Sequence, residues 1–160
     1  MRALKASGGF SLIEMLVVVV IVGVLATIGL SLAELAHKRA HEEELRQALR
    51  DIRSALDAYK RAVDEGHILR KANEPGFPPN LDILVEGVED LRSPTRDHLY
   101  FLRKLPADPF ATDETTRPSE TWAVRSYESP PENPQPGKDV YDVHSRSDEI
   151  GMNGVPYRQW

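Results

Sequence analysis

A single acidic residue, Glu14, lies near the start of a segment that is otherwise apolar and uncharged. Residues 15–33 contain no charged side chain. A carboxylate inside a membrane-length apolar segment is costly, and such residues usually have a function. Binding a cationic group would offset that cost, so Glu14 is the first candidate for chemistry in this chain.

The rest of the sequence shows no catalytic constellation. The five histidines are scattered, at His37, His41, His67, His98 and His144. His37 and His41 share a helix face and could bind a metal, but the neighbouring run 42–44, all glutamate, favours a solvated charged face. There is no phosphate-binding glycine loop and no serine elbow, and Asp108, between two prolines, is expected to form a turn. We predict that the protein is not an enzyme.

Composition limits the function further. The chain has 160 residues and no cysteine, which excludes disulfides and thiolate chemistry. From residue 34 onward there are 18 Lys+Arg and 24 Asp+Glu. An acidic domain is poorly suited to neutralising phosphates, so we predict that it binds no nucleic acid.

The apolar segment predicts a single membrane-spanning helix. Its 19 uncharged residues, 15–33, would extend roughly 28 Å as a helix, close to the ~30 Å hydrocarbon core of a bilayer. Arg2 and Lys5 precede it and should stay in the cytoplasm. We therefore expect an inner-membrane, single-pass protein whose C-terminal part lies in the periplasm.

Two ordinary targeting signals are alternatives. A cleaved secretory signal has an apolar core of about 7–15 residues followed by a small-x-small site; Ser31-Leu32-Ala33 fits that site, but the apolar run is too long and contains Glu14. An uncleaved signal anchor has suitable length and flanking charges, yet it leaves Glu14 without a role.

A third interpretation rests on the stretch Gly9-Phe10-Ser11-Leu12-Ile13-Glu14, which resembles the leader signature of type IV pilins. The resemblance implies that residues 1–9 are a leader peptide, and that a prepilin peptidase cuts between Gly9 and Phe10 and methylates the new amine. The amine lies one helical turn from Glu14. A neighbouring copy could offer its amine to this carboxylate and so set the register of a homopolymer.

The helical pattern continues beyond the membrane segment. We divide the helix into a transmembrane part, residues 10–33, and an amphipathic periplasmic part, residues 34–66, with Gly66 as its stop. Pilin-like relatives often carry a proline near the place of Ser31, which this chain lacks. The apolar residues with 3- and 4-residue spacing are Leu45, Ala48, Leu49, Ile52, Ala55, Leu56, Tyr59, Ala62 and Val63.

Residues 67–160 predict a small globular head. Asn80 can cap a short helix over 81–85. The four prolines within 129–137 predict a loop. Segments typical of strands follow one another at 99–102, 121–127 and 140–144. The predicted fold class is therefore α+β and type IV pilin-like, with a long N-terminal helix packed on a small antiparallel sheet.

The head is also similar to one branch, the major pseudopilin of type II secretion systems. This resemblance implies a periplasmic pseudopilus that drives protein export, with other pseudopilins and an inner-membrane assembly platform as partners. The alternatives are a type IV pilin or DNA-uptake pseudopilin, a monomeric membrane-anchored binding domain and an anchored hydrolase. The segments that carry the resemblance are Tyr59-Lys60, Phe77-Pro78-Pro79, Leu105-Pro106-Ala107-Asp108-Pro109-Phe110, Tyr141-Asp142-Val143-His144-Ser145 and Trp160.

The same resemblance implies a calcium site in the loop after the last strand. Calcium takes 6–8 oxygen ligands from carboxylates, carbonyls and water. The matching candidates are the Ser145 hydroxyl, the Arg146 carbonyl and Asp148, with Asn153 as a partial substitute for missing acidic ligands. An ordinary polar turn is the alternative for this loop.

Overall fold

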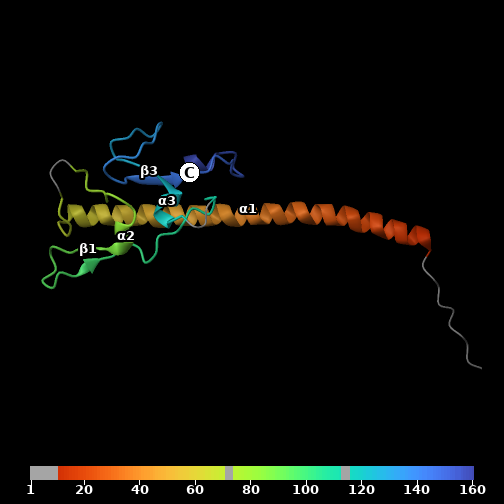
Figure 1. The fold of residues 1–160 in the computed structure, drawn as a ribbon, viewed down its shortest axis with the longest axis horizontal. Coiled ribbons are helices and arrows are strands. Elements are labelled where there is room, and N and C mark those ends of the chain that lie inside the picture. Colours follow the sequence, from red (N-terminus) through yellow and green to blue (C-terminus); the bar gives the residue numbers. More distant parts are fainter. Residues whose placement is uncertain (1–10, 71–73, 113–115) are drawn as a thin grey trace, which may run out of the picture. The chain divides into compact units, whose positions relative to one another are not determined.

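The computed structural model describes residues 11–70, 74–112 and 116–160, apart from the side chains of residues 26–32. Its main element is helix α1, Leu12–Asp64 (Figure 1). The chain divides into two compact units, Met1–Ala40 and His41–Trp160, and their boundary falls within α1. The predicted helical segments 10–33 and 34–66 therefore continue into each other within one helix from Leu12 onward.

In the first unit, α1 begins after Ser11, whose hydroxyl accepts a hydrogen bond of 3.3 Å from the Ile13 N–H. This contact satisfies one of the free donors at the helix start. Among the residues that the structure describes, no helix is long and apolar enough to cross a membrane. The predicted span includes Phe10 and the side chains of residues 26–32, which lie outside the described residues.

In the second unit, α1 supplies one wall of the core. All nine residues of the predicted apolar stripe are buried, which confirms that part of the pattern. The predicted stop is close to the observed end, because α1 ends at Asp64 and Gly66 has a φ of 79°. The His67 N–H then donates to the Ala62 carbonyl at 2.9 Å, closing the last turn.

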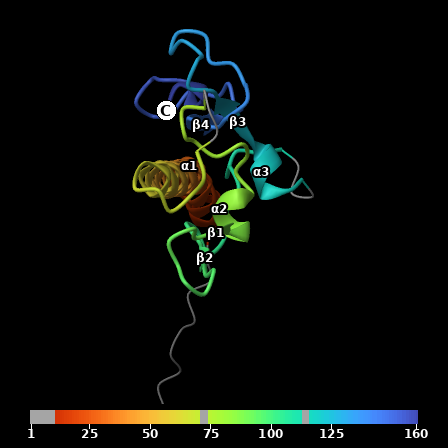
Figure 2. The same cartoon turned by 90° about the vertical axis from the view of Figure 1, so that its left-hand side faces the viewer.

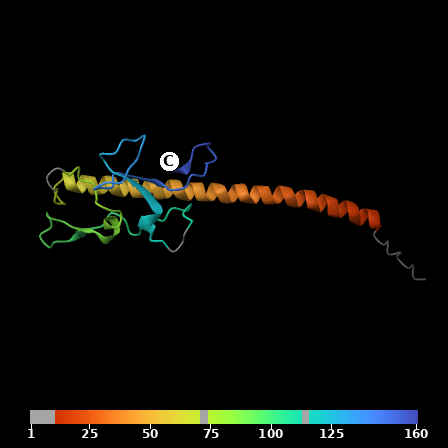
Figure 3. The ribbon, with the colours of Figure 1, turned by 45° about the horizontal axis from the view of Figure 1, so that its top comes forward.

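The head is α+β, as predicted, but its strands form two small antiparallel sheets. The first pairs β1 (Val88–Glu89) with β2 (His98–Leu99). The second pairs β3 (Trp122–Arg125) with β4 (Asp142–Ser145), with Val124 opposite Val143. The two sheets lie on different sides of the C-terminal part of α1 (Figures 2 and 3).

Short helices complete the head. Helix α2 is Ile83–Glu86, later than the predicted 81–85, and Asp82 takes its N-cap position. The side-chain oxygen of Asn80 still accepts a hydrogen bond from the first N–H of this helix, that of Ile83, at 3.1 Å. Helix α3 is Pro118–Thr121, and the 3-10 helix η1 is Tyr157–Gln159. The last two were not anticipated, because each is a single turn that carries no periodic pattern.

The predicted strand bounds were partly wrong. Strand β2 ends at Leu99 because the N–H groups of Phe101 and Leu102 both donate to the Leu84 carbonyl, at 3.0 and 2.9 Å. Strand β3 starts after Thr121, which belongs to α3. In the third predicted strand, the Val140 N–H donates to Pro78 at 2.8 Å, and regular pairing begins only at Asp142.

Candidate functional site

Glu14 lies in the first turn of α1 and is exposed to solvent in the single chain. Large apolar side chains surround it, and they are exposed too: Leu12 is 84% exposed and Leu16 is 58% exposed. The same is true of the large apolar residues as far as Leu25. Exposed apolar surface of this extent marks a contact with protein or lipid. Gly9 and Phe10, the predicted cleavage pair, lie outside the described residues.

The predicted calcium ligands are each engaged in other contacts. Ser145 is buried; its hydroxyl donates to Oδ2 of Asp108 at 2.6 Å and accepts from the Ser147 N–H at 3.0 Å. The guanidinium group of Arg146 donates through Nε to the Trp122 carbonyl at 3.1 Å. Ser145 therefore lies in the interior of the head, whereas Arg146 is exposed and its guanidinium contact does not involve the carbonyl predicted as a ligand.

The other two candidates also have protein partners. The Asp148 carboxylate forms an ion pair of 2.8 Å with Nη1 of Arg158. The side-chain oxygen of Asn153 accepts the Val155 N–H at 3.0 Å, within its own turn. Among the described residues, no group of three or more histidine, cysteine, aspartate or glutamate side chains could hold a metal ion. In this arrangement the side chains of Ser145, Asp148 and Asn153 are bonded to protein groups, and a calcium ion would have to displace those partners.

Glu42 is buried, with only 2% of its surface exposed, so the predicted solvated face over residues 42–44 is wrong at this position. Its Oε1 accepts hydrogen bonds from the Met152 N–H at 2.7 Å and the Tyr157 hydroxyl at 3.0 Å, and its Oε2 lies 3.3 Å from Arg46. Helical spacing could have revealed this, because Glu42 stands three residues before the buried Leu45.

Tyr157 is the centre of the cluster around Glu42. It is fully buried, with its ring stacked on Phe110 at 4.0 Å and perpendicular to Trp160 at 5.0 Å. Burial is the main cause that raises the pKa of Tyr157 to about 12, and the hydrogen bond to Glu42 is the second. The hydroxyl therefore stays protonated and serves as a donor, and the cluster is a structural anchor for the C-terminal segment.

A second contact from α1 holds the same segment. The Nε of Arg53 forms an ion pair with Asp142 at 2.8 Å, and its Nη2 donates to the main-chain oxygens of Val143 and Trp160, at 3.1 and 2.8 Å. The guanidinium group of Arg46 lies 4.4 Å from the centre of the Trp160 ring. Helix α1 thus fixes both β4 and the chain that follows it.

Asp108 forms the predicted turn. Its Oδ1 accepts the Phe110 N–H at 2.9 Å, two residues along the chain. Its main-chain N–H donates to the Thr121 hydroxyl at 3.0 Å, and its Oδ2 accepts from Ser145. The residue therefore joins the proline-rich loop to α3 and β4.

Comparison with known proteins identifies the N-terminal segment. Residues 4–30 match a family model described as the prokaryotic N-terminal methylation motif. No curated protein and no solved structure matches the chain. The motif overlaps the start of α1, and the long helix with an α+β head of small antiparallel sheets is consistent with a type IV pilin-like fold.

Proposed function

We propose that this chain is a structural subunit that is cleaved between Gly9 and Phe10, methylated on Phe10 and assembled into a filament through α1. The observation that carries the proposal is the methylation motif over residues 4–30, which includes the exposed apolar side chains of α1 from Leu12 to Leu25. In this proposal the anchor helix holds the subunit in the inner membrane and the head faces the periplasm.

Packing of α1 between copies would cover its exposed apolar side chains. Each large apolar side chain that becomes fully buried contributes roughly 1.5–3 kcal/mol. Glu14 would enter the same low-dielectric contact, where a lone carboxylate is costly unless it is paired. The Phe10 amine of a neighbouring copy is the partner that cleavage creates, so processing and register are linked.

The test compares Glu14→Ala with Glu34→Ala, a matched change at an exposed glutamate of the same helix. N-terminal mass spectrometry of membrane protein should find methylated Phe10 in both variants. Filament recovery should be lost in Glu14→Ala and retained in Glu34→Ala. An unprocessed Met1 would favour a monomeric membrane-anchored binding domain, and normal filaments from Glu14→Ala would contradict the role of Glu14.

Within this class, we propose a pseudopilus of a type II secretion system. The partners would be the prepilin peptidase, other pseudopilins and the inner-membrane assembly platform. Support comes from two head segments that resemble this branch, residues 105–110 and 141–145. They lie together in the fold, where the Ser145 hydroxyl donates to Asp108 at 2.6 Å. Deletion of the gene should then abolish export of folded proteins. Loss of twitching or DNA uptake instead would assign the chain to a type IV pilus or an uptake pseudopilus.

A further inference from the structure

The head contains an apolar groove that the contacts described above do not use. Its cavity volume is about 400 Å³. Leu69 and Leu91 on its wall are 73% and 55% exposed, so the groove opens onto a surface with large uncovered apolar side chains. Its apolar lining includes Tyr59, Ile68, Leu69, Phe77, Val88 and Leu91.

The rim of this groove is acidic. Among the described residues, Glu74, Glu89 and Glu128 line it together with one base, Lys138, and Glu89 also pairs with Arg96 at 3.3 Å. The fourth acid, Asp139, is buried and accepts hydrogen bonds from Ser126 and Tyr127. Glu128 is exposed and forms no ion pair with any described residue. An occupant that combines an apolar side chain with positive charge would complement both the wall and the rim.

The segment Tyr100–Lys104 of the same chain has this chemistry. Tyr100 is 66% exposed and lies across Gly87, where an added Cβ would come within 2.8 Å of its ring. Arg103 and Lys104 are exposed, and neither is paired with an acid among the described residues. By contrast, the two arginines next to Leu69 and Leu91 have partners within the chain: Arg70 donates to the Glu74 carbonyl and Arg92 donates to the Glu65 carbonyl.

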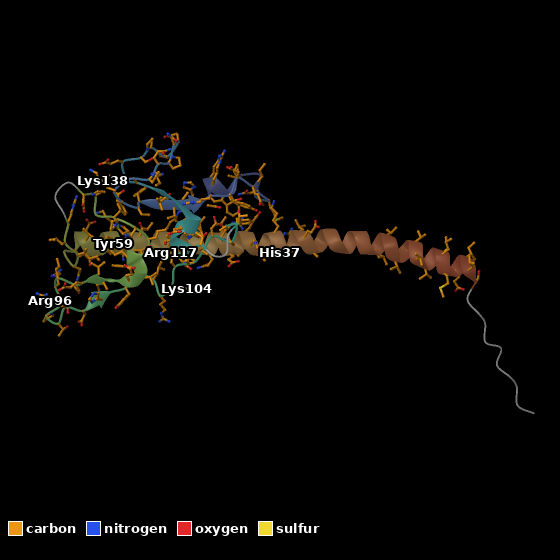
Figure 4. All side chains as sticks on the ribbon, in the orientation of Figure 1. His37, Tyr59, Arg96, Lys104, Arg117 and Lys138 are labelled. Atoms are coloured by element: carbon orange, nitrogen blue, oxygen red, sulfur yellow. The ribbon has the colours of Figure 1, made fainter. Side chains whose placement is uncertain are left out.

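The groove and the basic segment lie on different sides of α2. Ile83 lines the groove, whereas Val85, two residues later, lines the surface beside Tyr100. Figure 4 shows Lys104 extending from the ribbon on the side away from Lys138. A surface and its complement on different sides of one subunit give a head-to-tail contact, which repeats into an open chain rather than closing into a symmetric dimer.

We propose that the groove receives Tyr100–Lys104 of a second copy of this chain. Tyr100 lies against the apolar wall, and Arg103 and Lys104 face Glu128. The inference rests on the proposed filament, and it adds a contact between heads to the contact between helices. Because the acidic groove of one head meets the basic segment of the next, this contact also orients all subunits of the filament in the same direction.

The absence of cysteine from the chain allows a direct test by cross-linking. Filaments recovered after overproduction of the full chain would be oxidised with a Lys104→Cys, Glu128→Cys double variant. Covalent multimers should form. They should be absent from each single variant and from Lys104→Cys with Glu120→Cys, an exposed position that lies outside the groove.

Charge exchange supplies the second measurement. Glu128→Lys should reduce filament recovery, and adding Lys104→Glu in the same chain should restore it. Glu132→Lys, an exposed neighbour outside the groove, should leave recovery unchanged. Filaments that form without the cross-link and without sensitivity to Glu128→Lys would overturn the groove contact alone. Failure of the unaltered chain to form any filament would instead overturn the proposed function.

Discussion

The hydroxyl of Tyr157 donates a hydrogen bond of 3.0 Å to Oε1 of Glu42, 115 positions earlier in the chain. The same oxygen accepts the Met152 N–H at 2.7 Å. One carboxyl group of α1 thus holds the C-terminal segment at two points. Because Tyr157 is fully buried, its hydroxyl would lack a partner if the carboxyl group were removed, whereas the Met152 N–H contact is only part-buried.

Replacement of Glu42 by alanine is expected to destabilise the head. It leaves the buried Tyr157 hydroxyl unsatisfied, and a buried polar group left without a partner costs about 1–3 kcal/mol. The Met152 N–H also loses its acceptor. Glu44→Ala, at an exposed position of the same helix, is the control and should change stability by no more than about 0.5 kcal/mol. Thermal and denaturant unfolding of the full chain in detergent would measure both, and equal stability of the two variants would contradict the anchor.

Alkaline pH should also destabilise the head through Tyr157. Its pKa is raised to about 12 in the folded state, above the ordinary value near 10 for a free tyrosine. Between these values the folded state binds more protons than the unfolded state, so stability present below pH 10 is lost as the pH rises toward 12. Burial also raises the pKa of Tyr59, which acts in the same direction.

The Tyr157→Phe variant separates the two tyrosines. Its melting temperature should be lower than that of the unaltered chain at pH 8, because Glu42 loses a donor. The difference in melting temperature between the variant and the unaltered chain should decrease as the pH is raised from 10 to 12. A constant difference across this range would show that Tyr157 does not contribute to the pH dependence.

The link between Ser145 and Asp108 gives a third prediction. Ser145→Ala removes the hydroxyl that donates to the buried Asp108 carboxyl group and accepts from the Ser147 N–H. The expected loss in the free energy of unfolding is about 1–3 kcal/mol. Ser147→Ala should lose less, because its hydroxyl accepts only an exposed N–H, from Glu149. A smaller effect at Ser145 than at Ser147 would argue against the link.

Calcium is expected to leave the stability of the head unchanged. Asp148 is paired with Arg158, and Ser145 is bonded to Asp108, so the predicted ligands already have partners. A ligand that binds only the folded state raises its stability, and the melting temperature would reveal it. If millimolar calcium raised the melting temperature and Asp148→Asn abolished that increase, the loop would have to rearrange to bind the ion.

Some features follow from local patterns, and the sequence determines them by itself. The buried stripe from Leu45 to Val63 follows from helical spacing, since side chains three and four residues apart share a face. Gly66 ends α1 because it readily adopts a positive φ. The turn at Asp108 and the Asn80 cap likewise use groups only two or three residues away.

Other features depend on partners from distant parts of the chain, and only the tertiary structure decides them. Glu42 is buried because Met152 and Tyr157 supply its donors. Strand β2 is short because the Leu84 carbonyl accepts the N–H groups of Phe101 and Leu102. The calcium candidates face Asp108 and Arg158 for the same reason. Spacing shows which face of an element a residue occupies, but a polar group is satisfied by whichever partner the fold brings within hydrogen-bond distance.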